Sequence, residues 1–173
     1  MAHESIATVN DRYGNQIFRL YESAAPAGLR QKRNHRHAEF EVSLILSGSG
    51  CYSTAGGEVD IGEGDVFLFS SNEYHNIVRV DDGSDGAGMR ILNVHFLPGF
   101  LSGGGSASDN LYMNVFLCRT PDFRNRLDRN QPALDDVRQL LLRLRDACQR
   151  KEVCYVTEAQ HLLTAALITV LRR

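Results

Sequence analysis

Apolar and polar side chains alternate along several short stretches before residue 100, as they do in β-strands with one buried face. In residues 40–46 the even positions are all apolar, whereas Glu41 and Ser43 stand on the opposite face. Alternation or a short apolar run predicts strands over residues 16–22, 51–54, 58–61, 65–70, 75–80 and 89–96. Ala55-Gly56-Gly57 forms a predicted hairpin turn between two of them. Short strands without intervening helices predict an antiparallel sandwich or barrel.

After residue 110 the apolar positions recur every three to four residues, which is the period of an amphipathic helix. The stripe of the first predicted helix consists of Leu134, Val137, Leu141, Leu144 and Cys148. Pro132 suits the start of this helix, and Thr157 followed by Gln160 predicts the N-cap and capping box of a second one. Two such helices pack on the barrel or pair with a second copy of the chain, and the stripe alone does not choose between these arrangements.

Composition narrows the class of protein. The chain has 173 residues, of which 43% are hydrophobic and 23% charged, with a net charge of −2, so we expect one folded domain or one domain with a short appendage. No apolar run reaches the roughly 18 residues of a membrane-spanning helix, and no signal peptide is visible. The first 110 residues carry a net charge of −6 and the remainder +4, which argues against direct nucleic-acid binding. Four cysteines without C-x-x-C spacing are expected to be reduced thiols in the cytoplasm.

The candidate chemistry lies in a set of histidines. His35 and His37 are two residues apart and share a face of an extended segment, and Glu41 follows four residues on, again in phase. His75 lies on another predicted strand. A bulge or turn is expected near Ala38, because strict alternation would also turn the next residue inward. Three imidazoles and a carboxylate are ligands for one divalent metal ion (Zn, Ni or Fe) if they converge to about 2.0–2.2 Å of one point.

These residues carry a resemblance to a known superfamily. The spacing H-x-H-x3-E-x6-G over residues 35–48 matches the first cupin motif from its histidines onward, and G-x5-S-x4-H over residues 64–75 resembles the second. Ser70, Asn72 and Arg79 depart from the Pro, Gly and Asn that cupins usually have there. The resemblance implies a double-stranded β-helix (jelly-roll) barrel followed by two α-helices. In enzymatic cupins the four matching positions hold a catalytic metal.

A narrower resemblance is stronger. Residues 34–77 and 91–98 look like the N-terminal sensing domain of AraC-type transcription regulators. The resemblance implies an effector-binding barrel over residues 1–110, a helical dimerisation region over residues 111–173, and a helix-turn-helix DNA-binding domain that this chain lacks. The chain is therefore expected to be part of a longer protein and not an enzyme. The assigned homodimer contacts are the five stripe residues, Leu134, Val137, Leu141, Leu144 and Cys148.

The effector is expected to be a small molecule, a sugar or a small organic acid, and its identity is left open. The candidate effector-binding residues lie near the motif or on strands that reach the barrel mouth: Arg30, Arg36, Tyr52, Tyr74, Asn76 and His95. Two alternatives stay open. One is a stand-alone metal-dependent cupin enzyme, a dioxygenase or isomerase. The other is a dimerising scaffold whose barrel is filled by side chains.

Overall fold

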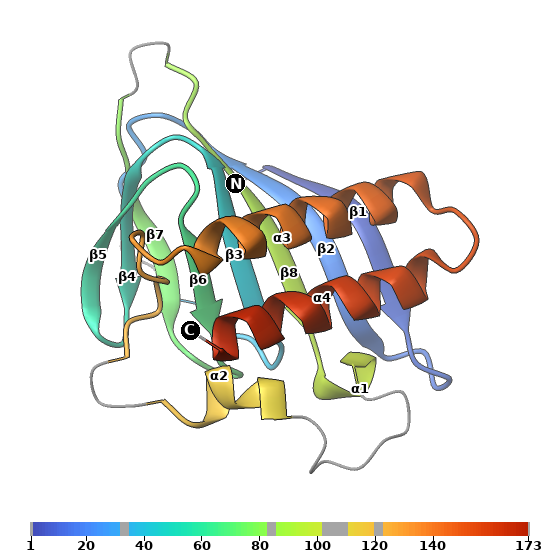
Figure 1. Cartoon of the computed structure of the whole chain (residues 1–173). Helices are drawn as coiled ribbons and strands as arrows, with labels where there is room; N and C mark the ends of the chain where they lie inside the picture. Colours follow the sequence, from blue (N-terminus) through green and yellow to red (C-terminus); the bar gives the residue numbers. More distant parts are fainter. Residues whose placement is uncertain (1, 32–34, 83–85, 102–110, 120–122, 173) are drawn as a thin grey trace.

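The structure, a computed structural model, describes residues 2–31, 35–82, 86–101, 111–119 and 123–172. Its strands form two antiparallel sheets that face each other, and two long helices cover the outside of the larger sheet (Figure 1). The larger sheet has the order β1-β2-β8-β3-β6 and the smaller sheet the order β5-β4-β7. The strands are β1 (Ala2–Asn10), β2 (Gln16–Ala25), β3 (Phe40–Ser47), β4 (Gly50–Thr54), β5 (Gly57–Ile61), β6 (Val66–Phe69), β7 (His75–Val80) and β8 (Met89–Phe96).

The alternation in β3 separates two apolar cores. Phe40, Val42 and Leu44 face the helices, whereas Ile45 belongs to the core between the sheets. That inner core fills one part of the barrel with side chains from both sheets, among them Phe67. The predicted mainly β architecture with C-terminal helices is confirmed, as is each predicted strand. A strand that the pattern did not predict, β1, forms the edge of the larger sheet by pairing with β2.

The two long helices are α3 (Ala133–Arg150) and α4 (Tyr155–Leu171). Shorter helical segments precede them: α1 (Pro98–Leu101), η2 (Leu111–Met113) and α2 (Asn114–Leu117). Thr157 is not the N-cap of the second helix, because α4 begins two residues earlier and Cys154 is its N-cap, in the left-handed conformation. Gln160 does not close a capping box either. Its side-chain amide donates to the backbone oxygen of Phe100 at 2.7 Å and so holds α1 against α4.

The five stripe residues that were predicted to contact a second copy are instead buried within the chain. Each of these side chains is at most 3% exposed, and all lie in the apolar core shared with the larger sheet: Leu134, Val137, Leu141, Leu144 and Cys148. Of the two arrangements that the sequence allowed, the stripe takes the one in which the helices pack on the barrel. These side chains are therefore not on the surface, where a second copy would meet them.

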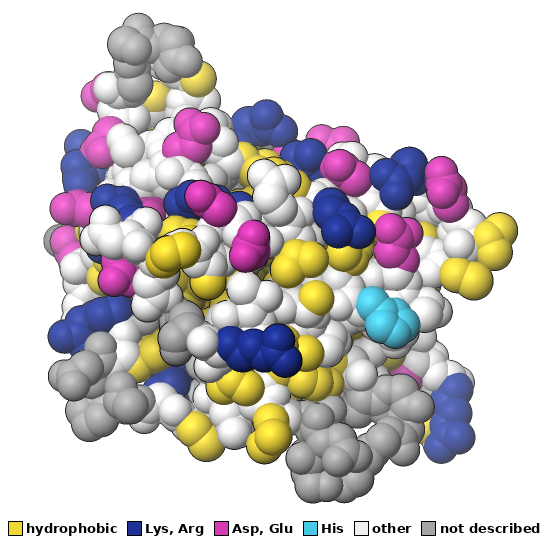
Figure 2. All heavy atoms as spheres, in the orientation of Figure 1, with side chains coloured by type: hydrophobic (Ala, Val, Ile, Leu, Met, Phe, Trp, Pro, Cys, Tyr) yellow, Lys and Arg dark blue, Asp and Glu magenta, His cyan; other side chains and the backbone are white. Residues whose placement is uncertain are grey.

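The outward faces of α3 and α4 show acidic, basic and apolar side chains interspersed (Figure 2). No helix in the described part of the chain is both long and apolar enough to cross a membrane. The division into a barrel over residues 1–110 and a helical region over residues 111–173 stays a prediction, because the boundary lies outside the described residues.

Candidate functional site

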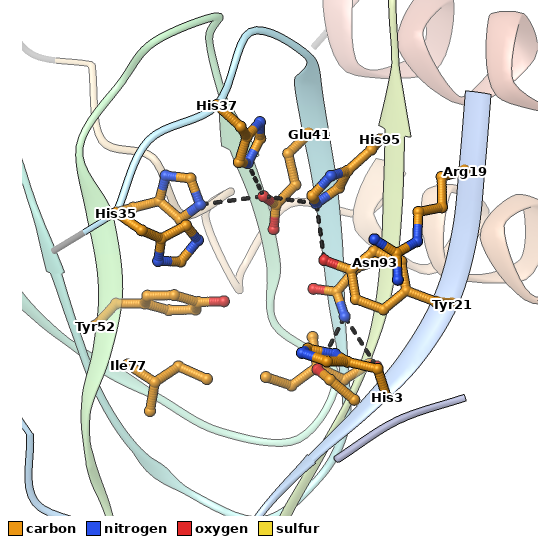
Figure 3. Close-up of a pocket in the computed structure, with 13 residues that line it drawn as sticks. His3, Arg19, Tyr21, His35, His37, Glu41, Tyr52, Ile77, Asn93 and His95 are labelled. Atoms are coloured by element: carbon orange, nitrogen blue, oxygen red, sulfur yellow. Dashed lines mark hydrogen bonds and ion pairs between the residues drawn. The ribbon is translucent and has the colours of Figure 1, made fainter. Parts of the chain in front are cut away.

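A cavity of about 320 Å³ lies between the two sheets. One wall comes from β2, β3 and β8 of the larger sheet, and the opposite wall comes from β4 and β7 of the smaller one (Figure 3). The side chains that line it are His3, Arg19, Tyr21, Ser23, His35, His37, Glu41, Tyr52, His75, Ile77, Ile91, Asn93 and His95. Because an open cavity of this size remains, the barrel is not filled by its own side chains.

Glu41 is the centre of the polar end of this cavity. Its Oε2 atom lies 2.9 Å from Nε2 of His37 and 3.1 Å from Nε2 of both His75 and His95. The hydroxyl of Ser43 donates to the other carboxylate oxygen. Strand register explains the convergence, since Glu41 pairs directly with His95 across β3 and β8. His35 forms an isolated β-bridge with His75, which brings the two histidine segments together.

The hydrogen bonds of two imidazoles fix their tautomers. Nδ1 of His37 lies 3.1 Å from the backbone oxygen of Glu39, and Nδ1 of His75 lies 2.9 Å from that of Glu73. A carbonyl oxygen only accepts, so each Nδ1 carries a proton, and in a neutral ring Nε2 is then a bare lone pair. Both lone pairs face the ionised carboxylate of Glu41, which also only accepts. This arrangement needs a cation between the rings and the carboxylate, either a proton or a metal ion.

The donor set fits a metal ion. Ligand atoms of His35, His37 and His75 lie within 4.8 Å of one another, and so do those of His37, Glu41 and His95. A tetrahedral site with bonds of about 2.0–2.1 Å has ligand atoms about 3.3 Å apart, close to the spacing around Glu41. Backbone oxygens that hold Nδ1 are the usual outer contacts of metal-binding imidazoles. The cluster can therefore hold a metal ion.

The charges at the cluster reinforce each other. Burial opposes ionisation of Glu41, but hydrogen bonds from His37, His75 and His95 outweigh it and hold its pKa well below the usual range. Burial also opposes the charged form of His37, yet the hydrogen bond to Glu41 and the carboxylate charge raise its pKa. Burial, together with the neighbouring His75, lowers the pKa of His35, and the attraction of the Glu41 carboxylate offsets this only in part. The Glu41 carboxylate therefore favours the protonated form of His37, 2.9 Å away, in the metal-free protein.

A comparison with known protein families identifies the domain. The family model described as the AraC-like ligand binding domain matches residues 20–163. The chain belongs to this family. A search of curated proteins gives no significant match.

Solved structures that resemble this AraC-like domain include cupin proteins. A cupin protein from Bacteroides fragilis is 20% identical, with 60% of this chain and 86% of that chain covered and a TM-score of 0.43. DMSP lyase DddQ from Ruegeria pomeroyi DSS-3 is 21% identical, with coverage of 56% and 47% and a TM-score of 0.43. A mutant of oxalate decarboxylase OxdC from Bacillus subtilis is 23% identical, with coverage of 59% and 26% and a TM-score of 0.39.

The AraC-like domain brings the four residues predicted to hold a metal, His35, His37, Glu41 and His75, to one end of the cavity. His35 lies at the rim, exposed, while His75 is buried. The chain bends at residues 38 and 39, as the expected turn near Ala38 requires.

The predicted effector-binding residues divide into two groups. Tyr52 and His95 line the cavity of the AraC-like domain, and four others do not: Arg30, Arg36, Tyr74 and Asn76. Arg30 donates to the backbone oxygens of Leu29 and Val80, at the outer face of the smaller sheet. Arg36 stacks over the exposed ring of Tyr74, 5.0 Å from its centre, and Asn76 accepts a hydrogen bond from Gln31. Arg30 and Arg36 do not line the cavity because the described residues around them form only isolated bridges, so the period-two rule does not apply to them. Asn76 lies on β7 between His75 and Ile77, which face the cavity, so it points to the opposite side of the sheet.

Sequence reasoning missed several lining residues. Arg19, Tyr21 and Ser23 line the cavity from β2, Asn93 from β8 and His3 from β1. The hydroxyl of Tyr21 lies 3.0 Å from Nε2 of His95, and the amide of Asn93 donates to the hydroxyl of Ser23 at 2.9 Å. For β2 the sequence did carry a signal. Its even positions 18 and 20 are apolar, so its odd positions were expected on the other face of the strand. His3 had no signal, because its strand was not predicted.

Proposed function

We propose that this AraC-like domain is the effector-sensing part of a cytoplasmic transcription regulator, and that a small molecule binds in the cavity between its sheets. The observation that carries the proposal is the open cavity of about 320 Å³ inside a ligand-binding family domain. Its volume falls in the range of about 300–1,000 Å³ that small-molecule sites occupy. Effector binding shifts the balance between arrangements of a homodimer, and a DNA-binding domain outside residues 1–173 responds to that shift.

Adjacent residues on β7 provide the test. Ile77 lines the cavity, whereas Val78 faces the outer side of the same sheet. We expect native mass spectrometry to detect a small molecule that the full chain acquires from a cell extract. Ile77→Phe narrows the cavity with a bulkier ring and should abolish this added mass, and Val78→Phe should keep it. Absence of any bound molecule in the wild type, or its retention in Ile77→Phe, would refute the proposal.

A metal-dependent cupin enzyme, a dioxygenase or isomerase, is the second candidate. The observation that favours it is the convergence of Nε2 of His37 and Nε2 of His75 on the carboxylate of Glu41, at 2.9 and 3.1 Å. We propose that these three residues, with His95 and with His35 at the rim, are the ligands of one divalent ion. Such an ion supplies Lewis-acid or redox chemistry when it is bound.

Metal analysis separates the two candidates. Protein purified without a histidine tag should be assayed for stoichiometric Zn, Ni or Fe, and then for oxygen uptake with small organic acids. A redox-active metal together with substrate-dependent oxygen uptake supports the dioxygenase. Effector binding without turnover supports the sensor. A metal that raises stability but supports no reaction is compatible with the sensor and argues against the enzyme.

A further inference from the structure

We propose that the cavity binds a small organic carboxylate, and that Arg19 is the residue that receives its charged group. The inference deepens the proposed sensing function and rests on it. It chooses between the two effector classes that the sequence left open, an organic acid and a sugar.

The first step concerns the charge of the cavity. Glu41 is the only carboxylate among the described residues that line it, and its oxygens are occupied by His37, His75, His95 and Ser43. No acidic group of the described lining remains to attract a cationic ligand.

The second step is the position of Arg19. On β2 its neighbours Phe18 and Leu20 are buried in the core under the helices, so Arg19 faces the cavity. Its guanidinium lies over the ring of Tyr21, 4.3 Å from the ring centre (Figure 3). Within the described part of the chain it forms no ion pair, although the side chain is half-buried. Arg90, on the neighbouring strand β8, is by contrast paired with Glu22.

A stacked guanidinium is well suited to an anion. Stacking on Tyr21 uses the flat face of the group and leaves N–H donors at its edges, in the fork geometry that matches two carboxylate oxygens. The hydroxyl of the same tyrosine contacts His95, so the ring is held in place beneath the guanidinium.

The third step distinguishes an acid from a sugar. The polar groups in the middle of the cavity lie against one another: the Asn93 amide donates to Ser23, and the Asn93 oxygen lies 3.3 Å from the Ser43 hydroxyl, whose proton goes to Glu41. The wall beside them includes two apolar side chains, Ile77 and Ile91, and the ring of Tyr52. A sugar would bury several hydroxyl groups with few free partners, which is costly. A ligand with an apolar body and one anionic end matches both surfaces.

The experiment uses the full chain after chelator treatment and five probes: benzoate, benzamide, phenylacetate, phenylacetamide and D-xylose. Isothermal titration calorimetry should show that a carboxylate binds more tightly than its uncharged amide. Arg19→Gln should weaken carboxylate binding about 10- to 100-fold, as expected for the loss of charge-assisted hydrogen bonds, and leave amide binding unchanged. Arg19→Lys should retain part of the affinity. Arg12→Gln is the matched control, because Arg12 also stacks on a tyrosine, Tyr13, at 4.7 Å but lies outside the cavity.

Equal affinity for acid and amide, or unchanged benzoate binding by a folded Arg19→Gln variant, overturns the inference. Binding of D-xylose without binding of either acid also overturns it, while the proposed sensing function stands. If none of the five probes binds, the inference fails, and the comparison of Ile77→Phe with Val78→Phe decides the sensing function separately.

Discussion

Replacing Glu41 by glutamine tests the centre of the site. The substitution keeps the shape of the side chain and removes its charge, so three imidazoles lose their shared anionic partner. A hydrogen bond to a charged group contributes about 1.5–3 kcal/mol and a neutral one about 0.5–1.5 kcal/mol, so the difference is roughly 1 kcal/mol per contact. For the three contacts we expect a loss of about 3 kcal/mol, less whatever relief comes from no longer burying a charge. The depressed pKa of Glu41 shows that the site favours the ionised form despite burial, so the net change is destabilising.

Thermal unfolding followed by circular dichroism measures this loss. At about 2–4 °C per kcal/mol for a chain of this length, the metal-free variant should melt roughly 6–12 °C below the wild type. Zinc at about 100 times its dissociation constant should stabilise the wild type by about 2.7 kcal/mol, whereas the variant should gain little. Glu39→Gln is the control, because Glu39 is partly exposed and only approaches His37 at 3.5 Å. A Glu41→Gln protein that is as stable as the wild type and gains as much from zinc would refute the reasoning.

Three further predictions concern the cluster and the helices. His95→Gln should weaken zinc binding, measured by competition with a chromogenic chelator, more than His35→Gln does, because His95 contacts the Glu41 carboxylate and His35 does not; the opposite order would place the ion at the rim. The raised pKa of His37 contributes stability that is complete below about pH 6.5 and is lost as the pH rises through the folded-state pKa, so denaturant unfolding of metal-free protein should show falling stability from about pH 6.5 upward. Zinc should oppose this fall, because metal competes with the proton. The paired substitution of Leu141 and Leu144 by Glu should unfold the chain in circular dichroism, because both side chains are fully buried; a folded monomer would instead support the dimer seam.

Much of the fold was predictable because most of its strands are alternating or wholly apolar runs that end at turns. Periodicity fails where this condition fails. β1 lies at a sheet edge and carries few apolar side chains, chiefly Ile6, Ala7 and Val9, so its pattern is weak. The start of α4 was misplaced because the turn before it uses the left-handed conformation at Lys151 and Cys154, which are not residues that signal it.

The candidate site was predictable in its ligand types and not in its contacts. The motif spacing and in-phase positions pointed to His35, His37 and Glu41 at one place. The contact between Glu41 and His95 depends on the register of β3 against β8, which no single strand pattern encodes. Arg19 was overlooked for a similar reason, because only the pairing of β2 with β8 places it next to His95.

The strand β2 separates the cavity from the apolar core under the helices. Tyr21 lines the cavity, and the adjacent Leu20 packs in the core that the larger sheet shares with the helices. A ligand that tilts this strand would therefore shift the packing of the helices directly, because only the backbone of β2 lies between them and the cavity. Communication between the interior of the barrel and the outside of the molecule needs no relay of intermediate side chains.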